Sequence, residues 1–120
     1  MKSADLEKFL LALPGATLSI QWGNDRVFKV GGKMFAVMGD PNDKNYAGGI
    51  SFKASSESFR ILTELDGIVP APYLARAEWV RLDKLKRLKT AELKAYLTRA
   101  HAIVASGLPK KTQKALGITP

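Results

Sequence analysis

The side chains most able to do chemistry in this 120-residue sequence are cationic, and they concentrate in its last third. Residues 1–75 carry eight Lys or Arg and eight Asp or Glu, whereas residues 76–120 carry eleven Lys or Arg and three acids. The second part therefore accounts for the whole net charge of +8. Because each phosphate neutralised by a cation releases condensed counterions, several cations on one surface favour polyanion binding. We predict a DNA-contacting surface formed by Lys84, Lys86, Arg87, Lys89, Lys94, Lys110, Lys111 and Lys114.

A solubilising surface is the simpler alternative, because exposed helices are commonly rich in Lys. Against it, acids are sparse among these cations. Little base readout is expected in either case, since no helix rich in Asn, Gln and Arg is available to enter a groove.

Catalytic and metal-binding chemistry is poorly represented. The chain has no Cys, which excludes disulfides, thiolate zinc sites and thiol nucleophiles. His101, the single His, has no neighbouring ligand set and is expected on the solvated face of a helix. Asp40 and Asp43 flank a Pro-Asn turn, where a divalent-ion site is the weaker interpretation. We therefore expect no enzyme activity, no cofactor and no metal site.

The run Gly31-Gly32-Lys33 is short of a phosphate-binding loop, which needs four residues between its glycines and a Ser or Thr after the Lys. Two glycines between alternating runs instead predict a two-residue hairpin, because its turn needs positive φ at both positions. Pairing Val30 with Lys33 would place Phe28 opposite Phe35 on one face of the sheet, together with Val37.

Large aromatic residues could stack on bases or fill the core. Trp22 continues an apolar alternation that begins at Leu18, so we predict that it is buried in the core. Trp79 would share with Arg81 the face of a strand that points away from the core. Its role is open between packing and contact with a partner, and the same holds for Tyr73.

These side chains are positioned by a predicted order of helix, three-strand meander, helix, strand and helix. Hydrophobic periodicity predicts helices over residues 5–13, 55–65 and 90–106, and strands over residues 18–22, 27–30, 33–37, 49–53 and 78–82. Ser55 and Thr90 are the predicted N-caps of the later helices. Short connections favour an antiparallel sheet with helices on one face, a two-layer α+β sandwich in a single domain over residues 1–120. No apolar run approaches the roughly 20 residues of a membrane span and no signal peptide is evident, so a cytoplasmic protein is expected.

Several short segments together resemble the MmcQ/YjbR family of small bacterial proteins. They are Leu13-Pro14-Gly15, the run from Phe28 to Ala36, Ile50-Ser51-Phe52-Lys53, Pro72-Tyr73-Leu74 with Trp79-Val80, and Leu108-Pro109-Lys110-Lys111. The resemblance implies a frataxin-like (YjbR/CyaY-like) α+β fold, described as a double wing and likened to type III secretion chaperones. It also implies the description DNA-binding, which derives from structural analogy. Relatives are often acidic before the last helix, whereas this chain is basic from Lys84 to Lys89.

Two functions follow as expectations. The first is a non-enzymatic protein that binds DNA through the phosphates. The alternative is a protein- or peptide-binding module resembling a secretion chaperone, which would use the sheet surface, Trp79 and Arg81, with its basic face meeting an acidic partner.

Overall fold

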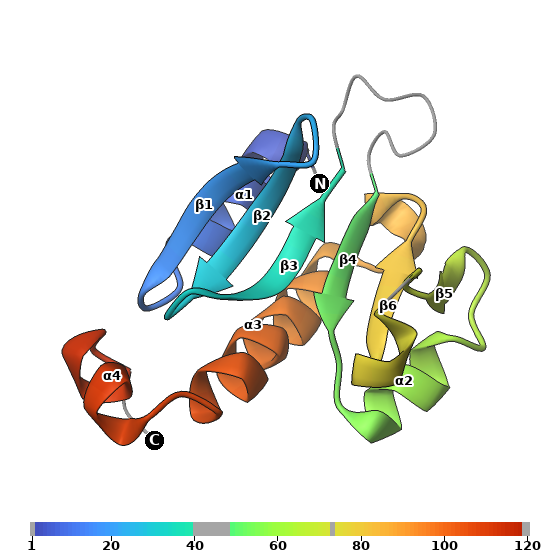
Figure 1. Cartoon of the computed structure of the whole chain (residues 1–120). Helices are drawn as coiled ribbons and strands as arrows, with labels where there is room; N and C mark the ends of the chain where they lie inside the picture. Colours follow the sequence, from blue (N-terminus) through green and yellow to red (C-terminus); the bar gives the residue numbers. More distant parts are fainter. Residues whose placement is uncertain (1, 40–48, 73, 119–120) are drawn as a thin grey trace.

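The computed structural model describes residues 2–39, 49–72 and 74–118. The expectations for Asp40, Asp43 and Tyr73 lie outside the described residues. The chain forms a six-stranded antiparallel sheet in the order β1-β2-β3-β4-β6-β5, with helices packed against it (Figure 1). This confirms the predicted α+β architecture. The elements are α1 (Ser3–Leu11), β1 (Ala16–Gln21), β2 (Asp25–Val30), β3 (Lys33–Met38), β4 (Ile50–Lys53), α2 (Ser56–Leu62), β5 (Ile68–Pro70), η1 (Ala75–Ala77), β6 (Trp79–Leu82), η2 (Leu85–Arg87), α3 (Thr90–Ser106) and α4 (Lys110–Ala115).

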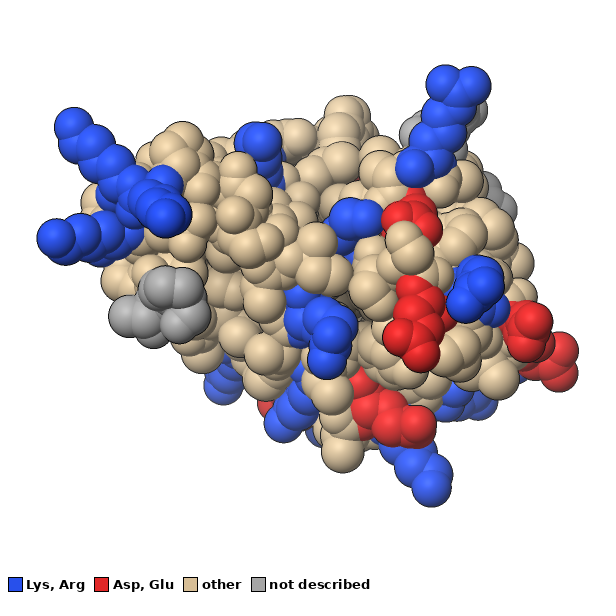
Figure 2. All heavy atoms as spheres, turned by 90° about the horizontal axis from the view of Figure 1, so that it is seen from below, with Lys and Arg blue, Asp and Glu red and all other residues tan. Residues whose placement is uncertain are grey.

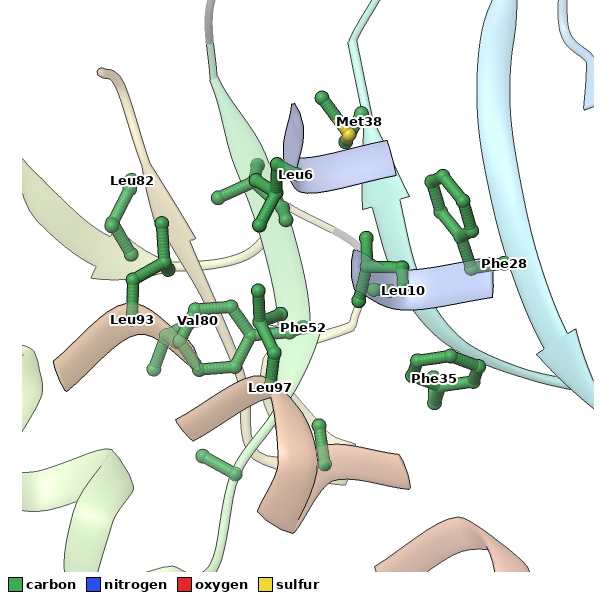
Figure 3. Packing of buried hydrophobic residues seen from close by; sticks show 14 of the residues in the cluster. Leu6, Leu10, Phe28, Phe35, Met38, Phe52, Val80, Leu82, Leu93 and Leu97 are labelled. Carbon is green, nitrogen blue, oxygen red and sulfur yellow. The ribbon is translucent and has the colours of Figure 1, made fainter. Parts of the chain in front are cut away.

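The main core lies between the sheet and helices α1 and α3. Leu6 and Leu10 come from α1, and Leu93 and Leu97 come from α3, and all four side chains are fully buried. Figure 3 shows these leucines meeting aromatic and aliphatic side chains from the strands, among them Phe52. Leu6 and Leu10, like Leu93 and Leu97, are four residues apart, a spacing that places both side chains of each pair on one face of their helix.

The hairpin of β2 and β3 forms where its two glycines predict it, with φ of 58° at Gly31 and 80° at Gly32. Val30 pairs with Lys33 as expected. The register then shifts, so that Phe28 pairs with Ala36, and the predicted pairing of Phe28 with Phe35 is wrong.

A β-bulge in β3 is the physical reason for this shift, because it inserts one extra residue into one strand. Phe35 and Ala36 are both fully buried, and the alternation after them is reversed. Val37 therefore turns away from the main core and Met38 enters it, which corrects the prediction for Val37. A prediction that assumes strict alternation of inward and outward side chains cannot detect such an insertion.

The helix ends test the predicted caps. The Ser55 hydroxyl accepts a hydrogen bond from the backbone N–H of Ser58 (3.1 Å), so the predicted cap of α2 is confirmed. Thr90 is instead the first residue of α3 and Lys89 holds the N-cap position, so the predicted Thr90 cap is wrong. The Glu92 carboxylate accepts a hydrogen bond from the Lys89 backbone N–H (3.3 Å), which supplies the acceptor at this helix end.

Four short elements were not predicted: β5, α4 and the two 3-10 helices η1 and η2. β5 is only three residues long and ends in Pro70, which an edge strand tolerates because one side of its backbone needs no partner. α4 is six residues long and rich in Lys, so it carries too little apolar periodicity to be recognised in the sequence.

Candidate functional site

Seven of the eight predicted phosphate contacts fall into two groups at opposite ends of α3, and the eighth, Lys94, lies on α3 itself (Figure 1). One group lies at η2, before α3, and the other lies on α4, after it. A helix of 17 residues is about 25 Å long at 1.5 Å per residue, which separates the groups. The structure therefore does not bring all eight cations onto one surface.

In the group before α3, Arg87 is held by an acid. Its guanidinium donates two hydrogen bonds to the Asp83 carboxylate, at 2.7 and 3.0 Å. The hydrogen bond from Arg87 lowers the pKa of Asp83, and the carboxylate in turn raises the pKa of Arg87. Arg87 also packs against Gly67, whose Cβ position would lie 2.0 Å from the Arg87 Nε. Arg87 thus links η2 to the residue before β5, and its guanidinium is used within the fold.

Along α3, Lys94 lies on the flank that faces α1, with its ammonium group 5.3 Å from the centroid of the Phe9 ring. This is cation–π distance, so Lys94 contributes to packing between the two helices. The exposed surface of α3 carries small uncharged residues, Ala91, Ala95, Thr98 and Ala102, together with the charged residues Glu92 and Arg99.

At the far end of α3, the chain docks α4 onto two turns of the N-terminal half. Gly31 at the β2–β3 turn has no room for a side chain, because its Cβ position lies 2.6 Å from Leu108 Cδ1. Gly15 at the α1–β1 turn has its Cβ position 3.1 Å from Leu116 Cβ. The leucines that flank α4 therefore hold it against both turns.

This docking adds two lysines that the sequence-based prediction missed. Lys33 lies two residues from Gly31. Lys29 pairs with Met34 in the second residue pair from the Gly31-Gly32 turn. We call the resulting surface the basic end, and its residues are Lys29, Lys33, Lys110, Lys111 and Lys114.

The basic end contains no acid among the described residues of the segments that build it, 8–24, 26–39 and 93–118. Figure 2 shows Lys and Arg side chains projecting from the left end, where α4 lies, while the acids seen in this view lie mainly away from it. Local cations without acids create a positive potential that attracts polyanions.

His101 is buried, with 6% of its surface exposed, so the prediction of a solvated residue is wrong. Its Nε2 donates a hydrogen bond to the carbonyl oxygen of Pro14 (2.7 Å), and its ring meets Phe35 edge-on. The buried face of α3 extends to this position because the helix packs against the α1–β1 turn as well as the sheet. His101 thus positions a turn of the basic end.

The opposite face of the sheet carries a pocket of about 360 Å³. Trp22 stands at one end of it, Met34 and Val37 lie along β3, and Pro72 and Leu74 close the side near β6. Trp22 is 64% exposed, so its predicted place in the core is wrong. The alternation of β1 ends at Gln21, and the turn that follows directs Trp22 outwards.

Trp79 lies on this same outer face but is only 4% exposed. The Ala71 backbone N–H donates a hydrogen bond to the Trp79 carbonyl oxygen, and the Trp79 N–H donates one to the Leu74 carbonyl oxygen, so Ala71 and Leu74 lie beside Trp79. A buried indole offers no surface to a partner, so Trp79 does not serve the predicted partner contact. Arg81, the other predicted contact, is partly exposed and lines the pocket.

Within the part of the chain that the structure describes, no three His, Cys, Asp or Glu side chains gather to hold a metal ion. None of the helices described there has the length and apolar character needed to cross a bilayer.

Comparison with known proteins places the chain in a family. Two solved structures share its fold: protein DR2400 of Deinococcus radiodurans, a DUF419 domain (TM-score 0.83, 23% identity, 97% of this chain and 88% of that chain), and a structural-genomics target from Pseudomonas syringae (0.70, 16%, 87% and 99%). No curated protein matches the sequence. The YjbR family model matches residues 11–103, more than half of the chain, so this protein belongs to the YjbR family.

Proposed function

We propose that this protein is a non-enzymatic DNA-binding protein that contacts phosphates through its basic end. The observation that carries the proposal is the docking of α4 onto the β2–β3 turn, which gathers Lys29, Lys33 and the three α4 lysines at one end of the molecule. Neither β3 nor α4 contains an acid, and the one acid of β2, Asp25, lies at the end of that strand away from the β2–β3 turn. A net charge of +8 adds long-range attraction to a polyanion.

The chemistry of these residues favours phosphate contact over base readout. A Lys ammonium is a compact point charge on a flexible stem, which suits phosphate oxygens, whereas base edges are usually read by bidentate Arg, Asn or Gln. The short helix α4 contains a single residue of those three types, Gln113. Its side-chain amide donates a hydrogen bond to the Leu108 carbonyl oxygen (2.7 Å) and is used within the fold. We therefore expect binding with little sequence preference.

The salt dependence of binding tests the proposal. If all five lysines of the basic end contact phosphates, log affinity should fall with log salt at a slope of about −4.5, at roughly −0.9 per contact. The measurement is fluorescence anisotropy with a labelled duplex of about 20 base pairs, between about 50 and about 200 mM salt. Absence of binding at the lowest salt, or a slope near zero, would reject the proposal.

The alternative peptide-binding function loses one of its two predicted contacts, because Trp79 is buried. The pocket on the outer face of the sheet extends as far as Met34, and none of the α4 lysines lines it. Phosphate binding is therefore the function that this end supports best.

A further inference from the structure

The outer-face pocket and the basic end adjoin each other. The pocket reaches Met34, which follows Lys33 in the chain and pairs across the hairpin with Lys29. From Met34 it extends past Val37 towards Trp22, at the other end of the β1–β2 hairpin. Lys29 and its cross-strand partner Met34 share the outer face, whereas Lys33 pairs with the buried Val30 on the other face. A ligand held by Lys29 could therefore continue into the pocket along the outer face of the sheet.

Trp22 combines an unusual backbone conformation with an exposed side chain. Its φ is 50°, in the left-handed region that bulky residues rarely adopt, and its side chain is 64% exposed. Most of the Trp22 side chain is therefore accessible to a ligand. Strained and exposed aromatic side chains beside a pocket are typical of binding sites.

We infer that this pocket receives a base of a single-stranded nucleic acid, with the base stacked on Trp22 and a phosphate farther along the same strand on Lys29. The inference rests on the proposed function and defines its substrate class. Single-strand binding combines aromatic platforms with a cationic track, and both features meet here.

The chemistry of the pocket distinguishes this ligand from two others. A duplex keeps its bases stacked inside the helix, where an indole on the protein surface cannot reach a base face. An apolar peptide would use Trp22 and Val37 but would gain nothing from Lys29. Asp25, which lines the Trp22 end, is an acceptor for the exocyclic amino group of a base such as cytosine.

The test compares Trp22→Ala with the matched Trp22→Phe variant. The two probes are a labelled single-stranded DNA octamer of deoxycytidine and a labelled DNA duplex. Because base–aromatic stacking changes single-strand affinity by roughly tenfold to a hundredfold, Trp22→Ala should weaken octamer binding by about that factor. Trp22→Phe should keep most of the affinity, because a benzene ring still offers a stacking face. Neither substitution should change duplex affinity.

Tryptophan fluorescence supplies a second readout. The octamer should quench the emission of the wild-type protein, whereas the Trp22→Ala variant reports only the buried Trp79 and should show little change. Circular dichroism would verify that both variants are folded.

The outcomes separate this inference from the proposed function. If Trp22→Ala binds the octamer as tightly as the wild type, or if an apolar peptide quenches Trp22 while the octamer does not, the pocket inference is overturned and the salt-dependent duplex binding is unaffected. If no nucleic acid binds in a salt-dependent manner, the proposed function fails, and unchanged Trp22 emission would reject the pocket inference separately.

Discussion

Two regions of the molecule are rich in cations, and they differ in what surrounds them. In the segment before α3, Arg87 is paired with Asp83, and Glu92 accepts a hydrogen bond from the backbone N–H of Lys89. The basic end collects its lysines from two distant parts of the chain, and neither β3 nor α4 contains an acid. The comparison shows that a run of cations in the sequence is a poor measure of positive potential. The potential that a ligand meets also depends on the acids that lie near those cations in the folded protein.

A matched pair of triple charge reversals would test this difference most strongly. Replacing Lys110, Lys111 and Lys114 with Glu, or replacing Lys84, Lys86 and Lys89 with Glu, lowers the net charge equally, from +8 to +2, since three reversals remove six charges. We expect the first variant to lose between about a hundredfold and about a thousandfold in duplex affinity and about three units of salt slope. The second should lose far less. Equal losses in anisotropy titrations would show that net charge alone governs binding and that the two regions are equivalent.

Gly31→Ala should disrupt the basic end by steric conflict. The new methyl group would meet Leu108, so we expect a loss of about 1 to 3 kcal/mol in the free energy of unfolding. Gly32→Ala is the control, because Gly32 also has positive φ but has open space around its Cβ position. Chemical denaturation would measure both variants, and equal losses would mean that backbone strain, and not contact with Leu108, limits this turn.

His101→Phe should weaken the attachment of the α1–β1 turn while preserving most of the buried volume. It removes the hydrogen bond to the Pro14 carbonyl oxygen, and loss of one such bond costs about 1 kcal/mol. Amide hydrogen exchange of the turn should rise, with little change in the strands β4 and β6. An unchanged exchange pattern would contradict a positioning role for His101.

Asp83→Asn should have the smallest effect, and it concerns the other region. Because the pKa of Asp83 is lowered in the folded protein, its ionised form stabilises the fold above the unfolded-state pKa, and this contribution is lost as the pH falls through the lowered pKa. The variant should therefore be slightly less stable than the wild type near neutral pH, and the two should converge in acid. Thermal unfolding as a function of pH would measure the difference, and a gap that persists in acid would assign Asp83 another role.

Much of the architecture could be predicted from local patterns. The two glycines at 31 and 32, the Ser55 cap and the apolar spacing of Leu93 and Leu97 each act through neighbouring residues, and the structure agrees with them. The β3 bulge could not be predicted, because the alternation of apolar and polar residues in a strand does not show whether one extra residue is inserted opposite its partner strand.

The site was predicted less well than the fold, and the reason lies in long-range contacts. Lys29 and Lys33 join the α4 lysines only because Leu108 packs on Gly31, a contact between residues 77 positions apart in the sequence. Trp22 was predicted to be buried and is exposed, because a turn directs it outwards. His101 was predicted to be exposed and is buried, because the α1–β1 turn packs against it on α3.

By itself, the sequence determined the class of fold, the position of the hairpin, the family and the excess of positive charge, because each depends on local patterns or on composition. Tertiary structure alone decided which cations share a surface, which aromatic ring is exposed and which face of the sheet is hollowed. These properties arise from contacts between distant segments, where packing and the proximity of opposite charges outweigh the order of residues along the chain.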